Sequence, residues 1–329
     1  MFKHLLVPLD GSILGEGALS HAVMIARSFQ SRVTLFHALQ PAITDEIACH
    51  CVNPLDWQMY SGQASTYLER WRLRLEKAGL TAKSVVMEGD PGSLVADFAR
   101  QHHVDLITLS GPVLAGAGQW NIGLGRIARE VVEETQTSMM LVPAHLQRGA
   151  IEDTVHYRRI MVPLDGSTRA ECALPTAVAL CSFHDAELVL AHIVCPPEMG
   201  GRYPLTREDR DLEKRVVERN RLEARRILTR LQQRLPGRVH TRLLEGRDVA
   251  FRLNELIERE NTDLVVMSAH GHSGNPQAPY GSVTGQILSY GLTPTIVVQD
   301  LAMTDAVRFP PNSQREEVAP IRQLEGSGR

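Results

Sequence analysis

One six-residue segment occurs twice in this chain of 329 residues. Val7–Ser12 reads VPLDGS, and the same letters return as Val162–Ser167. Other landmarks repeat in the same order, including Asp105–Ser110 (DLITLS) and Asp263–Ser268 (DLVVMS). A repeat of this period predicts two diverged copies of one domain joined head to tail, each long enough to bury its own core.

In each copy, short apolar runs alternate with helix-like stretches. The runs are apolar on both faces, as expected for strands that helices cover from either side. We therefore predict an α/β fold with two doubly wound domains, each an open parallel sheet of about five strands flanked by helices. The expected strands of the first copy, after the one that ends in VPLDGS, are Arg32–Ala38, Ala82–Met87, Leu106–Ser110 and Ser138–Val142, and the first expected helices of the two copies lie within Ala18–Ser28 and Ala170–Cys181.

The repeat also sets the expected domain boundaries. Residues 1–146 form the first domain and residues 157–300 the second. Beyond Asp300 the chain becomes irregular, with Pro310-Pro311 and a Gly326–Gly328 ending, so residues 301–329 are expected to be a mobile tail. A tail that docks on the domains is the alternative.

Composition narrows the class of protein. Hydrophobic residues make up 43% and charged residues 22% of the chain, the balance of a globular protein. The formal net charge of −3 gives no overall basic field, so nucleic acid and acidic membranes are not expected partners. No window approaches the roughly 18 apolar residues of a membrane span, and the first residues reach Asp10 too soon for a signal-peptide core. We expect a cytoplasmic protein without a membrane span.

The cysteines and histidines do not indicate a metal site. Five cysteines, an odd number, do not resemble a disulfide framework, so reduced thiols are expected. Cys49-His50-Cys51 is a single spaced cluster, for which a plain loop thiol is the preferred interpretation. In His102-His103-x-Asp105 the neighbouring histidines do not share a helix face, so surface or capping histidines are expected.

The strongest functional signal lies in the second copy. Met267–Gly271 (MSAHG) is followed, after nine residues, by Gly281–Thr284 (GSVT) at the start of a predicted helix. Glycine lets backbone amides approach an anion, and the helix directs its free N–H groups and positive dipole end toward it. A phosphate would fit there. Ser282 would add a hydroxyl donor, although an ordinary N-cap serine is an equal alternative.

This pattern resembles the universal stress protein family, whose nucleotide-binding members carry Gly-x-x-Gly, nine residues and Gly-Ser/Thr after the fourth strand. The resemblance covers nearly the whole chain twice, ends short of the tail, and implies a tandem protein with an adenine nucleotide α-hydrolase-like fold. His192 also falls where the family has a second-strand histidine. The implied ligand is ATP or a related adenine nucleotide, with Mg²⁺ as a companion left open.

The resemblance implies a set of nucleotide-binding residues in the second copy. Asp165 matches the aspartate that contacts the sugar, and Ile193 matches the position beside adenine. Ser268 replaces the first glycine of the signature, a change that is tolerated if the backbone there needs no positive φ. The full implied set is Pro163, Leu164, Asp165, Ile193, Met267, Ser268, His270, Gly271, Gly281, Ser282 and Val283.

The first copy departs further from the signature. Ser110 and Val113 stand where the two glycines belong, and Gly123-Leu124 replaces Gly-Ser. A Cβ at Val113 obstructs close backbone approach, so a weaker site or none is expected. Its residues would be Asp10, Ala38, Ser110 and Gly123, and a helix-capping role is the preferred interpretation of Asp10.

Binding is better supported than catalysis. The chain has no Walker A motif, and no lysine or arginine lies between Gly271 and Gly281 to stabilise a transferring phosphate. Asp165, His270 and Ser282 are residue types of a hydrolytic triad, but no Gly-x-Ser-x-Gly elbow presents the serine. We predict no catalytic residue and at most weak ATPase activity.

The charged stretch Glu208–Arg234 mixes both signs at helical spacing. This pattern favours a solvated helix with side-chain pairing over a nucleic-acid contact, with an apolar stripe on its inner side. The residues expected in that stripe are Leu212, Val216, Ile227 and Leu231.

Two functions from different classes follow. The first is a stress-response sensor or regulator that binds an adenine nucleotide in its second domain. The alternative is an interaction scaffold without nucleotide, in which the domains form an intramolecular pseudo-dimer and Met139–Val142 pairs with Thr295–Val298. A transferase related to nucleotide α-hydrolases lacks an identifiable substrate domain. Further pairing into a homodimer and an unknown regulatory protein partner are left open.

Overall fold

The computed structural model describes residues 1–40, 54–111, 125–143, 146, 155–198, 206–272 and 278–300. Cys49-His50-Cys51, Val113, Gly123-Leu124 and the expected tail 301–329 lie outside these ranges. The first copy contains β1 (His4–Pro8), α1 (Ile13–Phe29), β2 (Arg32–Leu39), α2 (Pro54–Lys77), β3 (Ala82–Glu88), α3 (Pro91–Gln101), β4 (Leu106–Gly111), α4 (Arg126–Glu134) and β5 (Ser138–Pro143). The second contains β6 (Arg159–Pro163), the 3-10 helix η2 (Ala170–Ala173), α5 (Leu174–His184), β7 (Glu187–Val194), α6 (Arg207–Arg234), β8 (Val239–Glu245), α7 (Val249–Arg259), β9 (Leu264–Ser268), α8 (Ser282–Tyr290) and β10 (Thr295–Val298).

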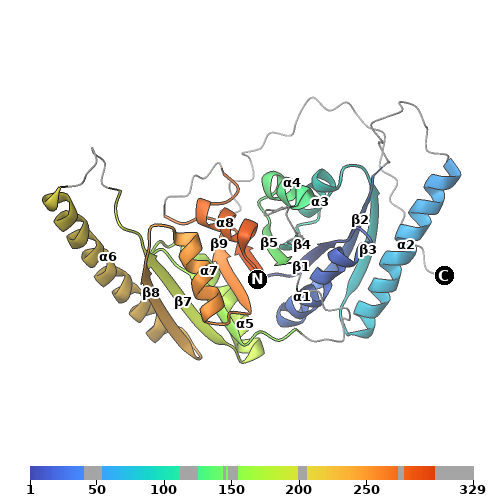
Figure 1. Ribbon diagram of the computed structural model, residues 1–329. Coiled ribbons are helices and arrows are strands. Elements are labelled where there is room, and N and C mark those ends of the chain that lie inside the picture. Colours follow the sequence, from blue (N-terminus) through green and yellow to red (C-terminus); the bar gives the residue numbers. More distant parts are fainter. Residues whose placement is uncertain are drawn as a thin grey trace.

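All these strands belong to one sheet, in the order β3-β2-β1-β4-β5-β10-β9-β6-β7-β8 (Figure 1). Within each copy the neighbouring strands are parallel, as the alternation of apolar runs and helices predicts. Helices α1, α2, α5 and α6 pack in the apolar core on one face, and α3, α4, α7 and α8 in the core on the other. The predicted doubly wound α/β fold is confirmed for both copies.

The two copies meet along an antiparallel strand pair. β5 and β10 align Met140 opposite Ile296, and Met139 opposite Val297. All four side chains are fully buried. The pairing satisfies both inner sheet edges within one chain and confirms the intramolecular pairing predicted for these segments.

Residues just before β6 also connect the copies. Tyr157 is 1% exposed, and its hydroxyl lies 2.8 Å from Nδ1 of His21 on α1. On its other side, the Tyr157 ring meets the ring of His184 on α5 edge to face, with centroids 4.9 Å apart. Nδ1 of His184 lies 3.2 Å from Nδ1 of His156. A small aromatic cluster therefore joins a helix of each copy.

An aspartate before the fourth strand of each copy has a structural role. Asp105 accepts hydrogen bonds from the amides of Lys3 and His4 at 2.7 and 2.9 Å, and Asp263 accepts those of Arg158 and Arg159 at the same distances. His102 ends α3 as its C-cap residue. The His102-His103-x-Asp105 motif thus closes one end of the sheet, in agreement with the capping interpretation.

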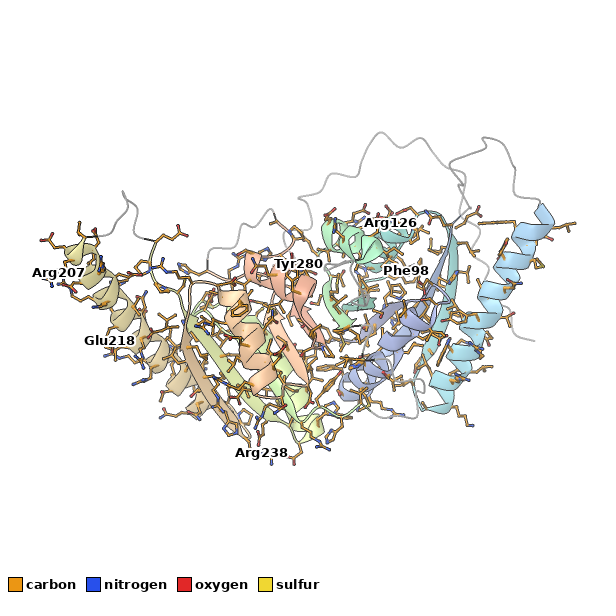
Figure 2. The ribbon with its side chains drawn as sticks, in the orientation of Figure 1. Phe98, Arg126, Arg207, Glu218, Arg238 and Tyr280 are labelled. Carbon is orange, nitrogen blue, oxygen red and sulfur yellow. The ribbon has the colours of Figure 1, made fainter. Side chains whose placement is uncertain are left out.

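Helix α6 carries its charges on the outside. It begins with a capping box between Thr206 and Asp209, and Arg207 and Glu218 lie on its outer side (Figure 2). The first turns of α6 extend past the sheet (Figure 1). The expected apolar stripe is partly wrong, because Leu212 is 48% exposed. The buried stripe begins further along the helix and comprises Ala224, Leu228 and Leu231.

The described cysteines Cys172, Cys181 and Cys195 are free thiols. Burial raises the pKa of Cys172 to about 11 and that of Cys181 to about 12, so both stay protonated at neutral pH. No helix in the described ranges has the length and hydropathy needed to cross a membrane.

Candidate functional site

The candidate site lies where the strand order of the second copy reverses. β6 pairs with β7 on one side and with β9 on the other, so the connections after β6 and β9 leave the same edge of the sheet in opposite directions. Ligands of open α/β sheets bind in this crevice beyond the carboxyl ends of the strands. Asp165 follows β6, and the segment from Ala269 to Gly281 connects β9 to α8.

Asp165 connects the two loops. One carboxylate oxygen accepts the amide and hydroxyl of Ser167 at 2.9 and 2.7 Å, and the other accepts the amide of His272 in the second loop. Burial raises the pKa of this carboxyl, but the hydrogen bonds from Ser167 and His272 outweigh it, so the pKa lies below its ordinary value. The site thus presents a carboxylate at its surface.

Gly271 is required by this arrangement. A Cβ on Gly271 would lie 2.2 Å from Oδ2 of Asp165, so this carboxylate would have to leave its place. Gly271 has no positive φ, so the requirement is steric and comes from the close approach of Asp165. Asp165 and Gly271 match the family pattern independently in the sequence, and the structure brings them into contact.

The base of the second loop is held by short internal bonds. The Ser268 hydroxyl donates to the carbonyl of His270 at 2.7 Å, and the Thr284 hydroxyl donates to the carbonyl of Ser268 at 3.0 Å. The Gly281 amide donates to the carbonyl of Ala269 at 2.8 Å, which brings the two ends of the loop together. Ser268 has no positive φ, so serine fits in place of the family's first glycine.

The first turn of α8 opens toward this loop. Gly281 is the N-cap residue, and no side chain caps the helix. Ser282 is the first helical residue and is exposed, so the alternative that Ser282 is an ordinary N-cap serine is wrong. Uncapped N–H groups and the positive end of a helix dipole suit an anion.

The imidazole of His270 points away from the surface. The side chain is fully buried, with Nδ1 2.8 Å from Oδ1 of Asp300 and Nε2 2.7 Å from the carbonyl of Ala278. Asp300 also pairs with Nε of Arg169. The sequence interpretation missed Asp300 and Arg169, because Asp300 was taken only as the last residue of the second domain and Arg169 belongs to no motif.

The apolar residues predicted for this site belong to the core beneath it. Ile193 and Met267 are 8% and 4% exposed, and Val283 packs against the same core. Leu164 is buried and its amide donates to the carbonyl of Ala191 at 2.8 Å, while Pro163 ends β6. The structure therefore gathers the residues named for the second copy at one edge of the sheet.

The corresponding edge of the first copy is built differently. Asp10 accepts the amide and hydroxyl of Ser12 at 2.9 and 2.6 Å, and the side chain of Ser12 caps α1. Asp10 therefore supports the capping residue rather than capping the helix itself. Ala38 lies in β2 and Ser110 in β4, where the buried Ser110 hydroxyl has no hydrogen-bond partner among the described residues.

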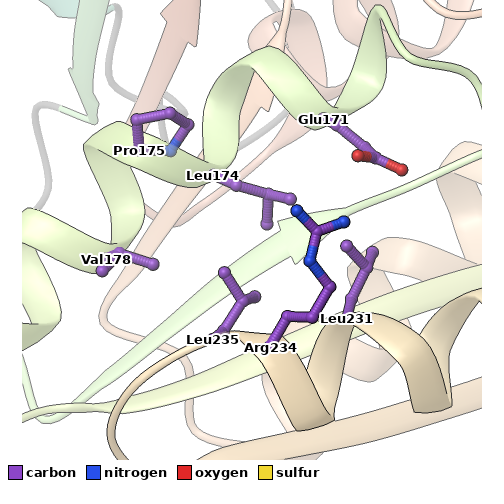
Figure 3. Close-up of a pocket in the computed structure, with 7 residues that line it drawn as sticks. All are labelled: Glu171, Leu174, Pro175, Val178, Leu231, Arg234 and Leu235. Carbon is purple, nitrogen blue, oxygen red and sulfur yellow. The ribbon is translucent and has the colours of Figure 1, made fainter.

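A separate cavity of about 320 Å³ lies between α5 and the end of α6 (Figure 3). Leu174, Leu231 and Leu235 supply apolar surface, and Glu171 and Arg234 carry its charges. It lies against the helical layer and includes none of the residues predicted to bind nucleotide. Its apolar lining does not suit a polyphosphate.

Fold and site together define a class of protein: two doubly wound α/β copies, one of which has, after its fourth strand, a loop that leads into a helix without a side-chain cap. The universal stress protein family model matches residues 1–143 and again residues 156–299. The chain belongs to the universal stress protein family and contains two copies of its domain.

Some relatives align with nearly the whole chain, and others with about one copy of the domain. A universal stress protein of Mycolicibacterium smegmatis is 24% identical over 312 residues, which covers 90% of this chain and 96% of that protein. A universal stress protein of Methanocaldococcus jannaschii is 26% identical and aligns with 44% of this chain and 97% of its own length. The crystal structure of a universal stress protein from Archaeoglobus fulgidus matches with a TM-score of 0.63 at 16% identity, covering 90% of this chain and 98% of that one. The last likeness concerns the fold alone.

Proposed function

We propose that the second copy binds ATP or a related adenine nucleotide at the β6–β9 edge, and that the protein acts in the cytoplasm as a stress-response sensor or regulator. The observation that carries this proposal is the contact between Asp165 and Gly271. It holds a carboxylate against the loop that leads to the start of α8, which has no side-chain cap. A nucleotide has a sugar for the carboxylate and phosphates for the helix.

Each part of the ligand has a partner in the second copy. Every carboxylate oxygen of Asp165 has lone pairs beyond its present bonds and would accept a ribose hydroxyl. The amides at the start of α8 and the Ser282 hydroxyl would donate to phosphate oxygens. The apolar side chains of Ile193, Met267 and Val283 would pack against adenine. No lysine or arginine lies between Gly271 and Gly281, so Mg²⁺ would accompany the phosphates.

The same geometry argues against rapid hydrolysis. Both ring nitrogens of His270 are bonded inside the protein, so this histidine does not serve as a base for Ser282. We therefore propose binding with slow or no hydrolysis.

Ion pairs such as Arg247–Glu213 engage charges of α6, which supports a solvated helix rather than a nucleic-acid contact.

The test is nucleotide release and titration. The purified protein is denatured, released nucleotide is identified by chromatography, and ATP is titrated into wild type, Gly281→Leu and Gly285→Leu. A Cβ at Gly281 meets Ala269, His270 and Gly271 at ordinary contact distances of 3.6–3.9 Å, so we expect the leucine variant to fold and its side chain to cover the loop, whereas the site of a Cβ at Gly285 is open.

About one adenine nucleotide per chain, lost only in Gly281→Leu, supports the proposal. Two per chain would show that the first copy also binds. No released nucleotide and no response up to millimolar ATP would overturn the proposal and leave the scaffold. The observation that favours the scaffold is the buried β5–β10 joint, which needs no ligand. A homodimer and a regulatory protein partner are compatible with both the nucleotide-binding function and the scaffold function.

A further inference from the structure

A buried charge network lies beneath the proposed nucleotide loop. Asp300 is 1% exposed at its side chain and bridges His270, which is fully buried, and Arg169, which is 31% exposed. Arg169 follows β6, His270 follows β9 and Asp300 follows β10. The network therefore ties together the ends of three strands at the edge that carries the site.

His270 extends this network into the loop. Its Nε2 lies 2.7 Å from the carbonyl of Ala278, three residues before Gly281 caps α8. The Ala278 carbonyl oxygen can only accept, so Nε2 of His270 donates in that bond, while Nδ1 bonds to Asp300. The Asp300 carboxylate faces this ring. Removing Asp300 would leave buried polar groups without partners, which is costly.

The first copy lacks all three members. Four residues beyond Asp10, where the second copy has Arg169, stands Leu14, which is 46% exposed. Alignment of DLITLS with DLVVMS places Pro112 at the position of His270, and the β5–β10 pairing places Ala144 at that of Asp300. The copy that lost the glycine loop has thus also lost the network beneath it, although both copies share the sheet.

We propose that Arg169 and Asp300 are positioning residues that hold His270, and through His270 the carbonyl of Ala278, in the places that nucleotide binding requires. This inference rests on the proposed function of the second copy. Neither residue needs to touch the ligand. Their effect is to fix the backbone at Gly271 and at the Gly281 turn, from which α8 directs its first free amides.

The test compares ATP affinity with stability in Asp300→Asn, Arg169→Leu and the double variant. Arg169→Leu installs the residue of the first copy. We expect each single variant to weaken ATP binding roughly 5- to 150-fold, the range typical of coupling between neighbouring sites. The double variant should be little worse than either single one, because both changes break one network. Arg169→Lys, which keeps the charge, should restore most of the affinity.

Asp263→Asn is the matched control. Asp263 is a structural aspartate of the same copy at the opposite end of β6, where it accepts two amides. Its loss should lower stability without a selective loss of affinity. Hydrogen exchange in the unliganded protein adds a second measurement: Asp300→Asn should accelerate exchange of the Gly281 amide, which is bonded to Ala269, but not of β8 amides.

The measurements distinguish a failure of the proposed nucleotide binding from a failure of the positioning role. If wild type does not bind ATP, both the proposed function and the positioning role in ATP binding are overturned. If wild type binds and the Asp300 and Arg169 variants bind within twofold of it, the positioning role alone is overturned. Equal losses of affinity in Asp263→Asn would also overturn it, because the effect would then be general instability.

Discussion

The contact between Gly271 and Asp165 gives a sharp prediction for the change Gly271→Ala. The added methyl carbon would lie 2.2 Å from Oδ2 and 3.2 Å from Cγ of Asp165, so the carboxylate must move. The move breaks the bond from the His272 amide. Hydrogen bonds to charged groups contribute about 1.5–3 kcal/mol, but Asp165 is exposed and water replaces part of this one, so we expect a loss of about 1–2 kcal/mol. For a domain of this size, that lowers the melting temperature roughly 2–8 °C.

The assay is urea and thermal denaturation of Gly271→Ala, Asp165→Ala and the double variant. Without the Asp165 carboxylate the methyl group has room, so Gly271→Ala should cost little in the Asp165→Ala background. Gly285→Ala, on α8 where a Cβ meets open space, is the control and should be neutral or stabilising by about 1 kcal/mol. Additive losses in the double variant would refute the reasoning, because they would show that the glycine is needed for another reason.

Two further predictions concern the joint and the aromatic cluster. Met140→Lys places a charge in the fully buried β5–β10 pair and should lower the free energy of unfolding by about 3 kcal/mol or more. Urea denaturation should show this loss, and solution scattering should show a larger radius of gyration. Leu73→Lys, at an exposed site, should be neutral, and equal effects of the two changes would contradict the buried joint. Burial and the neighbouring His156 lower the pKa of His184 to about 4 from an ordinary 6.5, so its neutral form stabilises the fold above pH 6.5 and this contribution disappears as the pH falls toward 4. Denaturation across that range should show the loss in wild type and less of it in His184→Gln, and parallel curves would exclude His184 as the cause.

The repeat made the fold predictable from the sequence because strand and helix periodicities recur in both copies, and the strand limits differ from the predicted ones by about one residue. The prediction for α6 was partly wrong because periodicity marks an apolar face but does not reveal how far along the helix that face is covered, and Leu212 is 48% exposed. Asp165 and Gly271 carry motif signals, so they were found. Asp300 and Arg169 were not, since their pairing joins residues 131 positions apart and no local pattern encodes it.

The direction of His270 was equally hidden. A sequence places a histidine in a loop but does not say whether the ring faces solvent or core, and here the fully buried ring faces Asp300. The role of Ser282 depended on a single residue of helix register, because Gly281 rather than Ser282 caps α8. Such details are set by tertiary contacts that form after the local elements are in place.

The antiparallel joint of β5 and β10 has a consequence for divergence. Two identical chains that associate through such an edge must repeat every substitution on both sides of their symmetry axis. Here Met140 and Ile296 sit opposite each other at the same place on that axis, yet they are different residues of one chain. Covalent linkage fixes the stoichiometry of the two halves at one to one while freeing each from the other's sequence. Leu14 and Arg169 occupy equivalent positions under that freedom, and one half was able to change its crevice without altering the other.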